Sequence, residues 1–143
     1  MGKERILKEL DLVRRFKKVR DTVMTQKDPK LLKNTVNEAI RLGSPIRSFS
    51  RIAIKDIEIE EYIIPKNSRV MMVFASANRD ENVYEKPNEF SINRDFKEHL
   101  GFGHGIHSCV GMHLAQIEMI LLLEAMLPLV KKIETKEPEI ALN

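Results

Sequence analysis

The sequence has little of several residue types, and each shortage excludes something. It holds one cysteine, no tryptophan and only six glycines in 143 residues. A single cysteine cannot form an internal disulfide, which favours a protein of the reducing cytoplasm. The most apolar stretch, residues 110–130, is interrupted by polar residues and Pro128 and is too broken for a membrane span. The start of the sequence has no apolar run and no small-residue cleavage site, so we predict no secretion signal.

Positive and negative charges nearly balance over the whole sequence, but positive charge is in excess at its amino-terminal end. The net charge is +3, and residues 1–33 carry 11 Lys or Arg against 5 Asp or Glu. A basic amino-terminal segment could bind nucleic acid or another anionic partner. Phe16 is the only aromatic residue in it, however, and stacking on bases needs several. We therefore interpret the basic residues as the solvated face of a helix and expect no nucleic-acid partner.

Hydrophobic periodicity predicts three helices. The first is a basic amphipathic helical segment within residues 1–27, with an apolar stripe of Ile6, Leu10, Val13, Phe16 and Val23. A second helix is expected after Asp28 as N-cap and Pro29 in the first turn, ending at Gly43. The last begins near Val110 and is apolar on nearly every face, which predicts a central core helix.

Between the second and last helices the pattern changes to period two. Residues 51–64 alternate isoleucines with charged residues, as half-buried strands do. Residues 69–77 predict a buried strand that runs into a polar loop at 78–90. The expected fold class is therefore mainly α with a small antiparallel β-sheet.

Fifteen residues, "HLGFGHGIHSCVGMH" from His99 to His113, contain the only cysteine and all four histidines. His104, His107, Cys109 and His113 could in principle bind one zinc ion. Structural zinc sites usually combine a short knuckle with ligands from a second, distant element, and none exists here. This argues against zinc.

The glycines of this stretch indicate a different ligand. Three of them alternate with larger residues and would let the backbone approach a flat ligand. A cysteine at the start of a helix lies at the positive end of the helix dipole, which stabilises a thiolate. Phe102 would shield its sulfur from water. Such a thiolate is a strong axial ligand for haem iron.

The pattern Phe102-Gly103-x-Gly105-x-His107-x-Cys109-x-Gly111 resembles the haem-binding loop of the cytochrome P450 superfamily. The resemblance implies haem b as cofactor and Cys109 as the proximal iron ligand. It implies further that His107 contacts a haem propionate and that Phe102, Gly103 and Gly111 line the cofactor. His99, His104 and His113 are expected to be bystanders.

Upstream residues extend the resemblance. Glu38 and Arg41 stand three apart on one helix face, and alone such a pair is usually a weak surface ion pair. In the family this pair is buried and holds an arginine from the loop before the haem site, a position that Arg94 matches. Arg51 matches an arginine that pairs with a haem propionate.

The resemblance implies a monooxygenase that inserts one oxygen atom of O2 into a small organic substrate, with electrons from a ferredoxin or flavoprotein. It covers residues 28–143, the carboxy-terminal haem-binding region of a truncated family fold. The distal helix that activates oxygen is absent, so no catalytic residue is assigned in this chain. We expect a substrate only if a distal half is supplied, and half a pocket predicts weak haem binding. Whether the chain is an enzyme is left open; the alternative is a non-catalytic remnant or interaction module.

Overall fold

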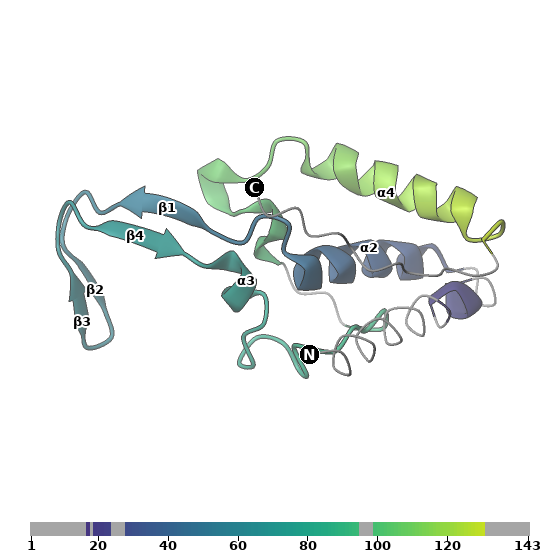
Figure 1. Ribbon diagram of the computed structural model, residues 1–143, viewed down its shortest axis with the longest axis horizontal. Coiled ribbons are helices and arrows are strands. Elements are labelled where there is room, and N and C mark those ends of the chain that lie inside the picture. Colours follow the sequence, from purple (N-terminus) through teal and green to yellow (C-terminus); the bar gives the residue numbers. More distant parts are fainter. Residues whose placement is uncertain (1–16, 18, 24–27, 95–98, 131–143) are drawn as a thin grey trace, which may run out of the picture.

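The computed structural model describes residues 17, 19–23, 28–94 and 99–130. Figure 1 shows helices α2 (Pro29–Gly43) and α4 (Met112–Met126) side by side, with the strands extending away from them. The predicted amino-terminal helix falls largely outside the described residues; 19–23 are helical. The fold is helix-rich with small antiparallel sheets, in the element order that the sequence predicts.

Helix α2 begins and ends where the sequence predicts. The Asp28 side chain accepts a hydrogen bond from the Lys30 N–H at 2.9 Å, and Pro29 occupies the first turn. At the other end Ser44 adopts a left-handed conformation with φ 39°, and its N–H donates to the Ile40 carbonyl at 2.8 Å. Both predicted ends of this helix are confirmed.

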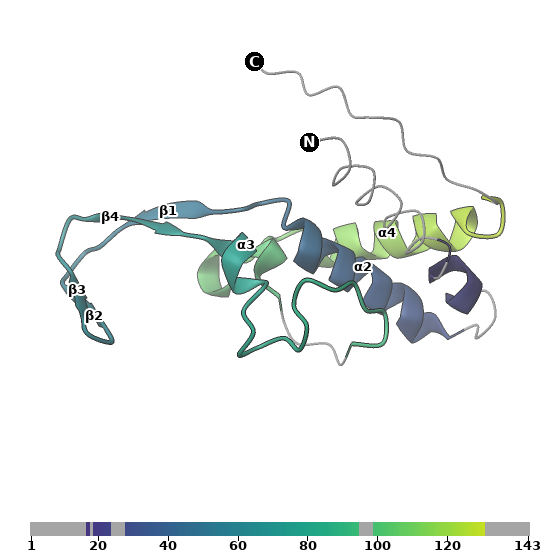
Figure 2. The ribbon, with the colours of Figure 1, turned by 60° about the horizontal axis from the view of Figure 1, so that its bottom comes forward.

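The strands form two separate antiparallel pairs. Strand β1 (Phe49–Ile52) pairs with β4 (Arg69–Met72), so that Arg51 lies opposite Val70. Strand β2 (Ile57–Ile59) pairs with β3 (Tyr62–Ile64) at the far end of the molecule, as both ribbon views show (Figures 1 and 2). All three residues of β2 are exposed, so its isoleucines do not form the half-buried face that the alternation predicts.

The prediction of a buried strand over residues 69–77 is confirmed only for a strand at Arg69–Met72, and it is wrong in burial and in the residues that follow. Strand β4 ends at Met72 and is exposed at every second residue, and the one-turn helix α3 (Phe74–Ala77) follows. The N–H of Asn78 donates to the Phe74 carbonyl at 2.9 Å and closes that turn. A short run of apolar residues is compatible with a strand and with a buried helical turn. In this protein the helical turn buries the Phe74 ring.

One hydrophobic cluster connects the helices. It comprises Val19, Val23, Leu31, Leu32, Ile92 and Leu127, with Phe90, Ile120 and Leu123 packed against it. Gln116 of α4 also donates its side-chain amide to the Asn37 carbonyl oxygen of α2 at 2.8 Å. The described part of the first segment therefore shares its core with the rest of the chain.

Helix α4 is not buried on nearly every face as predicted. None of its residues is fully buried. Helix α2 covers one side, while Leu114, Ile117, Leu121 and Leu122, here called the α4 stripe, are each more than half exposed on other faces. Within the part of the chain that the structure describes, no helix has the length and apolarity needed to cross a membrane.

Candidate functional site

The glycine-rich loop of residues 99–111, here called the cysteine loop, leads into α4 through two short 3₁₀ helices, η1 (Leu100–Phe102) and η2 (Gly105–His107). Gly103 and Gly105 have φ of 75° and 65°, values that residues with a Cβ seldom adopt. The loop is closed by the N–H of Cys109, which donates to the Phe102 carbonyl at 2.8 Å. The backbone itself thus fixes where Cys109 lies relative to the start of the loop.

Cys109 is exposed and precedes helix α4 by a short turn. Its carbonyl accepts a hydrogen bond from the Met112 N–H at 3.2 Å, and α4 starts at Met112. Gly111, the N-cap, provides no side-chain acceptor, so the first N–H groups of the helix have no capping side chain. Cys109 therefore lies just before the amino-terminal, positive end of α4.

The residues that could bind a metal indicate which kind of metal site this loop can form. Among the described residues, which include Cys109 and every histidine, no three His, Cys, Asp or Glu side chains come close enough to hold one ion. A tetrahedral zinc site needs four ligands, three at the least from protein. A single exposed thiol instead suits a metal that brings its other ligands with it, as haem iron does. Haem fits the residues present, and the zinc interpretation loses its support.

The structure constrains the remaining residues of the loop to different degrees. His107 is exposed, and the Cβ position at Gly111 faces open space, so the structure by itself assigns no role to either residue. A Cβ on Gly103 would lie 3.0 Å from the His107 carbonyl, so this glycine is needed for the loop itself. The Phe102 ring lies 5.9 Å from the His99 ring, while Cys109 remains exposed. Shielding of the sulfur by Phe102 is therefore not seen in this chain alone and stays a prediction.

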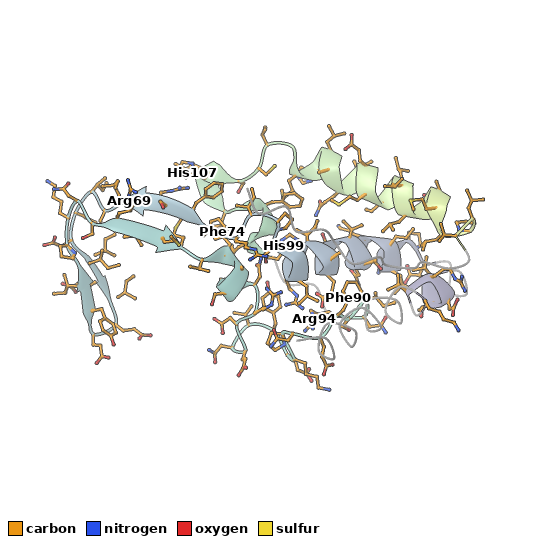
Figure 3. All side chains as sticks on the ribbon, in the orientation of Figure 1. Arg69, Phe74, Phe90, Arg94, His99 and His107 are labelled. Carbon is orange, nitrogen blue, oxygen red and sulfur yellow. The ribbon has the colours of Figure 1, made fainter. Side chains whose placement is uncertain are left out.

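Arg51 lies on β1, away from Cys109 in the sequence and without a carboxylate partner in the described residues. It is half-buried, donates from Nη1 to the Ser50 carbonyl at 3.0 Å and lies 5.9 Å from the Phe49 ring centroid. Figure 3 shows His107 on the outer side of the loop, above the strand pair in that view. No hydrogen bond or ion pair joins Arg51 to His107, and their contact with a propionate stays a prediction.

The structure brings Glu38, Arg41 and Arg94 together. Arg41 forms a bidentate pair with Glu38, from Nε to Oε2 and from Nη2 to Oε1, both at 2.8 Å. Arg94 donates from Nε to Glu38 Oε1 at 3.1 Å. Arg41 is 1% exposed and Glu38 4% exposed, so this is a buried network and not a surface ion pair.

The two arginines also hold the loop that precedes the cysteine loop. Arg41 donates from Nη1 to the carbonyls of Asn78 and Pro87, each at 2.7 Å. Arg94 donates to the carbonyls of Glu85, Lys86 and Glu89. The guanidinium of Arg41 lies 4.8 Å from the centroid of the Tyr84 ring. One carboxylate therefore organises a chain segment that has no regular secondary structure.

Burial alone would raise the pKa of Glu38, but hydrogen bonds from Arg41, the Ser91 N–H and Arg94 outweigh it and hold the pKa below its usual value. Because the folded pKa lies below the unfolded one of about 4.3, the stability that Glu38 contributes is complete above that pH. It is lost as the pH falls through the lowered folded pKa. We expect the denaturation midpoint to drop in acid, and the drop to be smaller in Glu38→Gln; equal acid sensitivity in both proteins would contradict this.

His99 has a structural role that the sequence analysis did not predict. It is 6% exposed, and its Nδ1 accepts a hydrogen bond from the Gly101 N–H at 3.0 Å, which caps helix η1. His104 and His113 are exposed. The sequence offered no signal for this role, because histidine is not among the usual N-cap residues.

Gly101 fits where no side chain could. A Cβ there would lie 2.5 Å from Ile40 Cγ2 of α2, well inside van der Waals contact. We expect Gly101→Ala to lower the free energy of unfolding by about 1–3 kcal/mol, because the loop and α2 must separate. Gly43→Ala is the matched control, since its Cβ position faces open space at the end of a helix. Denaturant titration measures both, and equal midpoints would contradict the close packing.

Three residues of this support escaped the sequence analysis: Ser44, Asn78 and Tyr84. All are buried, at 2%, 0% and 4% exposure. Tyr84 is a large aromatic residue beside Val83 in an otherwise polar stretch of the loop, which was a usable signal. Ser44 and Asn78 are typical turn residues, so their composition does not distinguish them from exposed ones.

Comparison with known proteins gives a consistent result. The family model described as Cytochrome P450 matches residues 2–132. Cytochrome P450-terp of Pseudomonas sp is 43% identical over 115 residues, which are 80% of this chain and 27% of that protein. Linalool 8-monooxygenase of Pseudomonas putida is 38% identical over 106 residues, 74% of this chain and 26% of the relative.

A solved structure agrees with these relatives. Cytochrome P450-153 from Novosphingobium aromaticivorans superposes with a TM-score of 0.71 at 37% identity, covering 80% of this chain and 29% of that one. The chain thus spans about a quarter of the length of the curated relatives it matches.

Proposed function

The chain belongs to the cytochrome P450 family, and from this premise we propose that it is the thiolate side of a haem b site, with Cys109 as the axial ligand of the iron. The observation that carries the proposal is the exposed thiol of Cys109, held by the Phe102–Cys109 hydrogen bond at the start of α4. It is a one-ligand metal site, and the family uses a haem-iron cofactor of that kind.

We assign the other residues to three roles: contact with the propionates, contact with the ring and support of the preceding loop. His107 and Arg51 would donate hydrogen bonds to the haem propionates, since both are polar donors without a carboxylate partner in the described chain. Phe102, Gly103 and Gly111 form the surface that meets the ring. Glu38, Arg41 and Arg94 hold the preceding loop in register, which is where a buried charge network has its best-supported use.

The activity proposed for the complete site is monooxygenation of a small organic substrate. Haem, if bound, would supply the oxygen chemistry with electrons from a ferredoxin or flavoprotein, and Cys109 as a thiolate would donate electron density to its iron. This chain's part is to present Cys109 as a thiolate and to orient the ring. A thiol that must stay reduced suits the cytoplasm, where we place the protein.

The test is spectroscopic. The purified protein is supplied with haem, reduced and exposed to carbon monoxide. We expect the red-shifted absorption band of a thiolate–iron–carbon monoxide adduct. If haem binds but this band is absent, Cys109 is not the ligand and the proposal fails.

A second candidate is a non-catalytic interaction module of the same family. The exposed α4 stripe favours it, because several large apolar side chains exposed on one helix often mark an interaction site. This candidate predicts poor haem retention and no substrate-dependent oxygen consumption with NAD(P)H and competent electron donors. Oxygen consumption coupled to product formation would exclude it.

A further inference from the structure

Asn78 lies at the junction of α2, α3 and the cysteine loop. It is completely buried, at 0% exposure, and forms the C-cap of α3. Its backbone carbonyl accepts the 2.7 Å hydrogen bond from Arg41 Nη1. The residue is therefore tied to the buried Glu38 network through its backbone, which leaves its side chain for other partners.

Both polar atoms of the Asn78 side-chain amide form hydrogen bonds, one as an acceptor and the other as a donor. Its Oδ1 accepts a hydrogen bond from the Leu100 N–H at 2.7 Å. Its Nδ2 donates to Ser44 Oγ at 3.0 Å, while the Ser44 hydroxyl donates its own proton to the Arg41 carbonyl at 2.8 Å. Ser44 can therefore only accept from Asn78, and Leu100 can only donate to it, so the orientation of the amide is determined by its partners.

The Leu100 N–H lies at the start of the cysteine loop. Leu100 starts helix η1, and its carbonyl accepts from the Gly103 N–H at 3.1 Å. Helix η1 ends at Phe102, whose carbonyl holds the Cys109 N–H at 2.8 Å. Three hydrogen bonds thus lead from the Asn78 amide to the backbone of the cysteine.

We propose that Asn78 is a positioning residue for Cys109, acting through its hydrogen bond to the Leu100 N–H. The inference rests on the proposed function, because the position of Cys109 matters for iron ligation. Asn78 touches neither cofactor nor iron. The structural alternative is that Asn78 only supports the fold through Ser44, and the two bonds of the side chain allow these roles to be separated.

The experiment compares three variants with the wild type. Asn78→Ala removes both hydrogen bonds. Asn78→Asp keeps an acceptor for the Leu100 N–H but loses the donor to Ser44 and sets an oxygen against Ser44 Oγ. Ser44→Ala removes the bond from Asn78 Nδ2 together with the bond from Ser44 Oγ to the Arg41 carbonyl, and it leaves the bond to Leu100 in place. The exposed Asn88, in the same region of the chain, gives the control Asn88→Ala.

We expect Asn78→Asp and Ser44→Ala to lose stability but to keep the wild-type ratio of thiolate-type band to total haem. Asn78→Ala should lose most of that ratio, and Asn88→Ala should match the wild type in both. In the haem-free protein, exchange of the Leu100 amide should be faster by about fivefold or more in Asn78→Ala, because a buried N–H loses its acceptor. The rate of Cys109 alkylation should change in Asn78→Ala alone.

Two outcomes are decisive against the inference. If Asn78→Ala keeps the wild-type band ratio and alkylation rate while losing stability, Asn78 is merely structural. If Asn78→Asp behaves like Asn78→Ala in the band ratio, or in alkylation when no band forms, the bond to Leu100 is not the one that matters. Should the wild type itself give no thiolate-type band, the proposed function fails, and the haem-free exchange and alkylation rates still decide the role of Asn78.

Discussion

Replacing Cys109 by serine is expected to abolish the thiolate-type band of the reduced, carbon monoxide-treated protein completely. Serine keeps the size of the side chain and the backbone N–H that bonds to Phe102. Its hydroxyl does not ionise near neutral pH, so it cannot replace the thiolate at the iron. The chain has no other thiol to take over this function.

The same substitution should leave the fold intact. Cys109 is exposed, and substitutions at exposed positions usually change stability by less than about 0.5 kcal/mol. Unfolding by denaturant, measured without haem, separates loss of the ligand from loss of the fold. A thiolate-type band that survives in Cys109→Ser would refute ligation by this residue.

His104→Ala is the matched control. His104 is exposed on the same loop, and its side chain makes no capping bond to helix η2. We expect it to retain the wild-type band. Stoichiometric zinc that is bound by the wild type and lost in both variants would instead revive the zinc interpretation.

The second large effect is expected in the buried network. Glu38→Gln should lower the free energy of unfolding by about 3–5 kcal/mol, the usual cost of removing one partner of a buried ion pair. Its amide cannot neutralise two guanidinium groups. Glu38 Oε1 accepts from Arg41, the Ser91 N–H and Arg94, so an NH2 group at either position of the carboxylate meets donors only.

Thermal unfolding offers a direct measurement, with a decrease in Tm on the order of 10 °C. The control is Glu58→Gln, because Glu58 lies exposed on strand β2; it should change the free energy of unfolding by less than about 0.5 kcal/mol. A loss below about 1 kcal/mol in Glu38→Gln would mean that water replaces the carboxylate at low cost.

The elements that sequence predicted well are those set by local chemistry. The bounds of α2 follow from Asp28, Pro29 and the turn after Gly43, each of which acts within a few residues. The position of Cys109 before a helix follows in the same way from the glycines and the apolar run beside it. Such signals need no knowledge of the remaining chain.

The failures have a different cause. Residues 69–77 and helix α4 are apolar, and apolar composition indicates burial without saying which element does the burying. The partners of Asn78 and Gly101 lie in other elements, 22 residues away at Leu100 and in α2 at Ile40. Polar turn residues and glycines acquire such roles only through tertiary contacts, so composition and spacing cannot identify them.

The α4 stripe has a consequence for the fate of the chain in a cell. Four large aliphatic side chains on one helix, each more than half in water, are the kind of surface to which chaperones bind and near which proteases act. Salts that strengthen apolar association would drive such molecules together in solution. An uncovered surface of this kind would lower the abundance of a protein in a cell even where the free energy of its fold is unchanged.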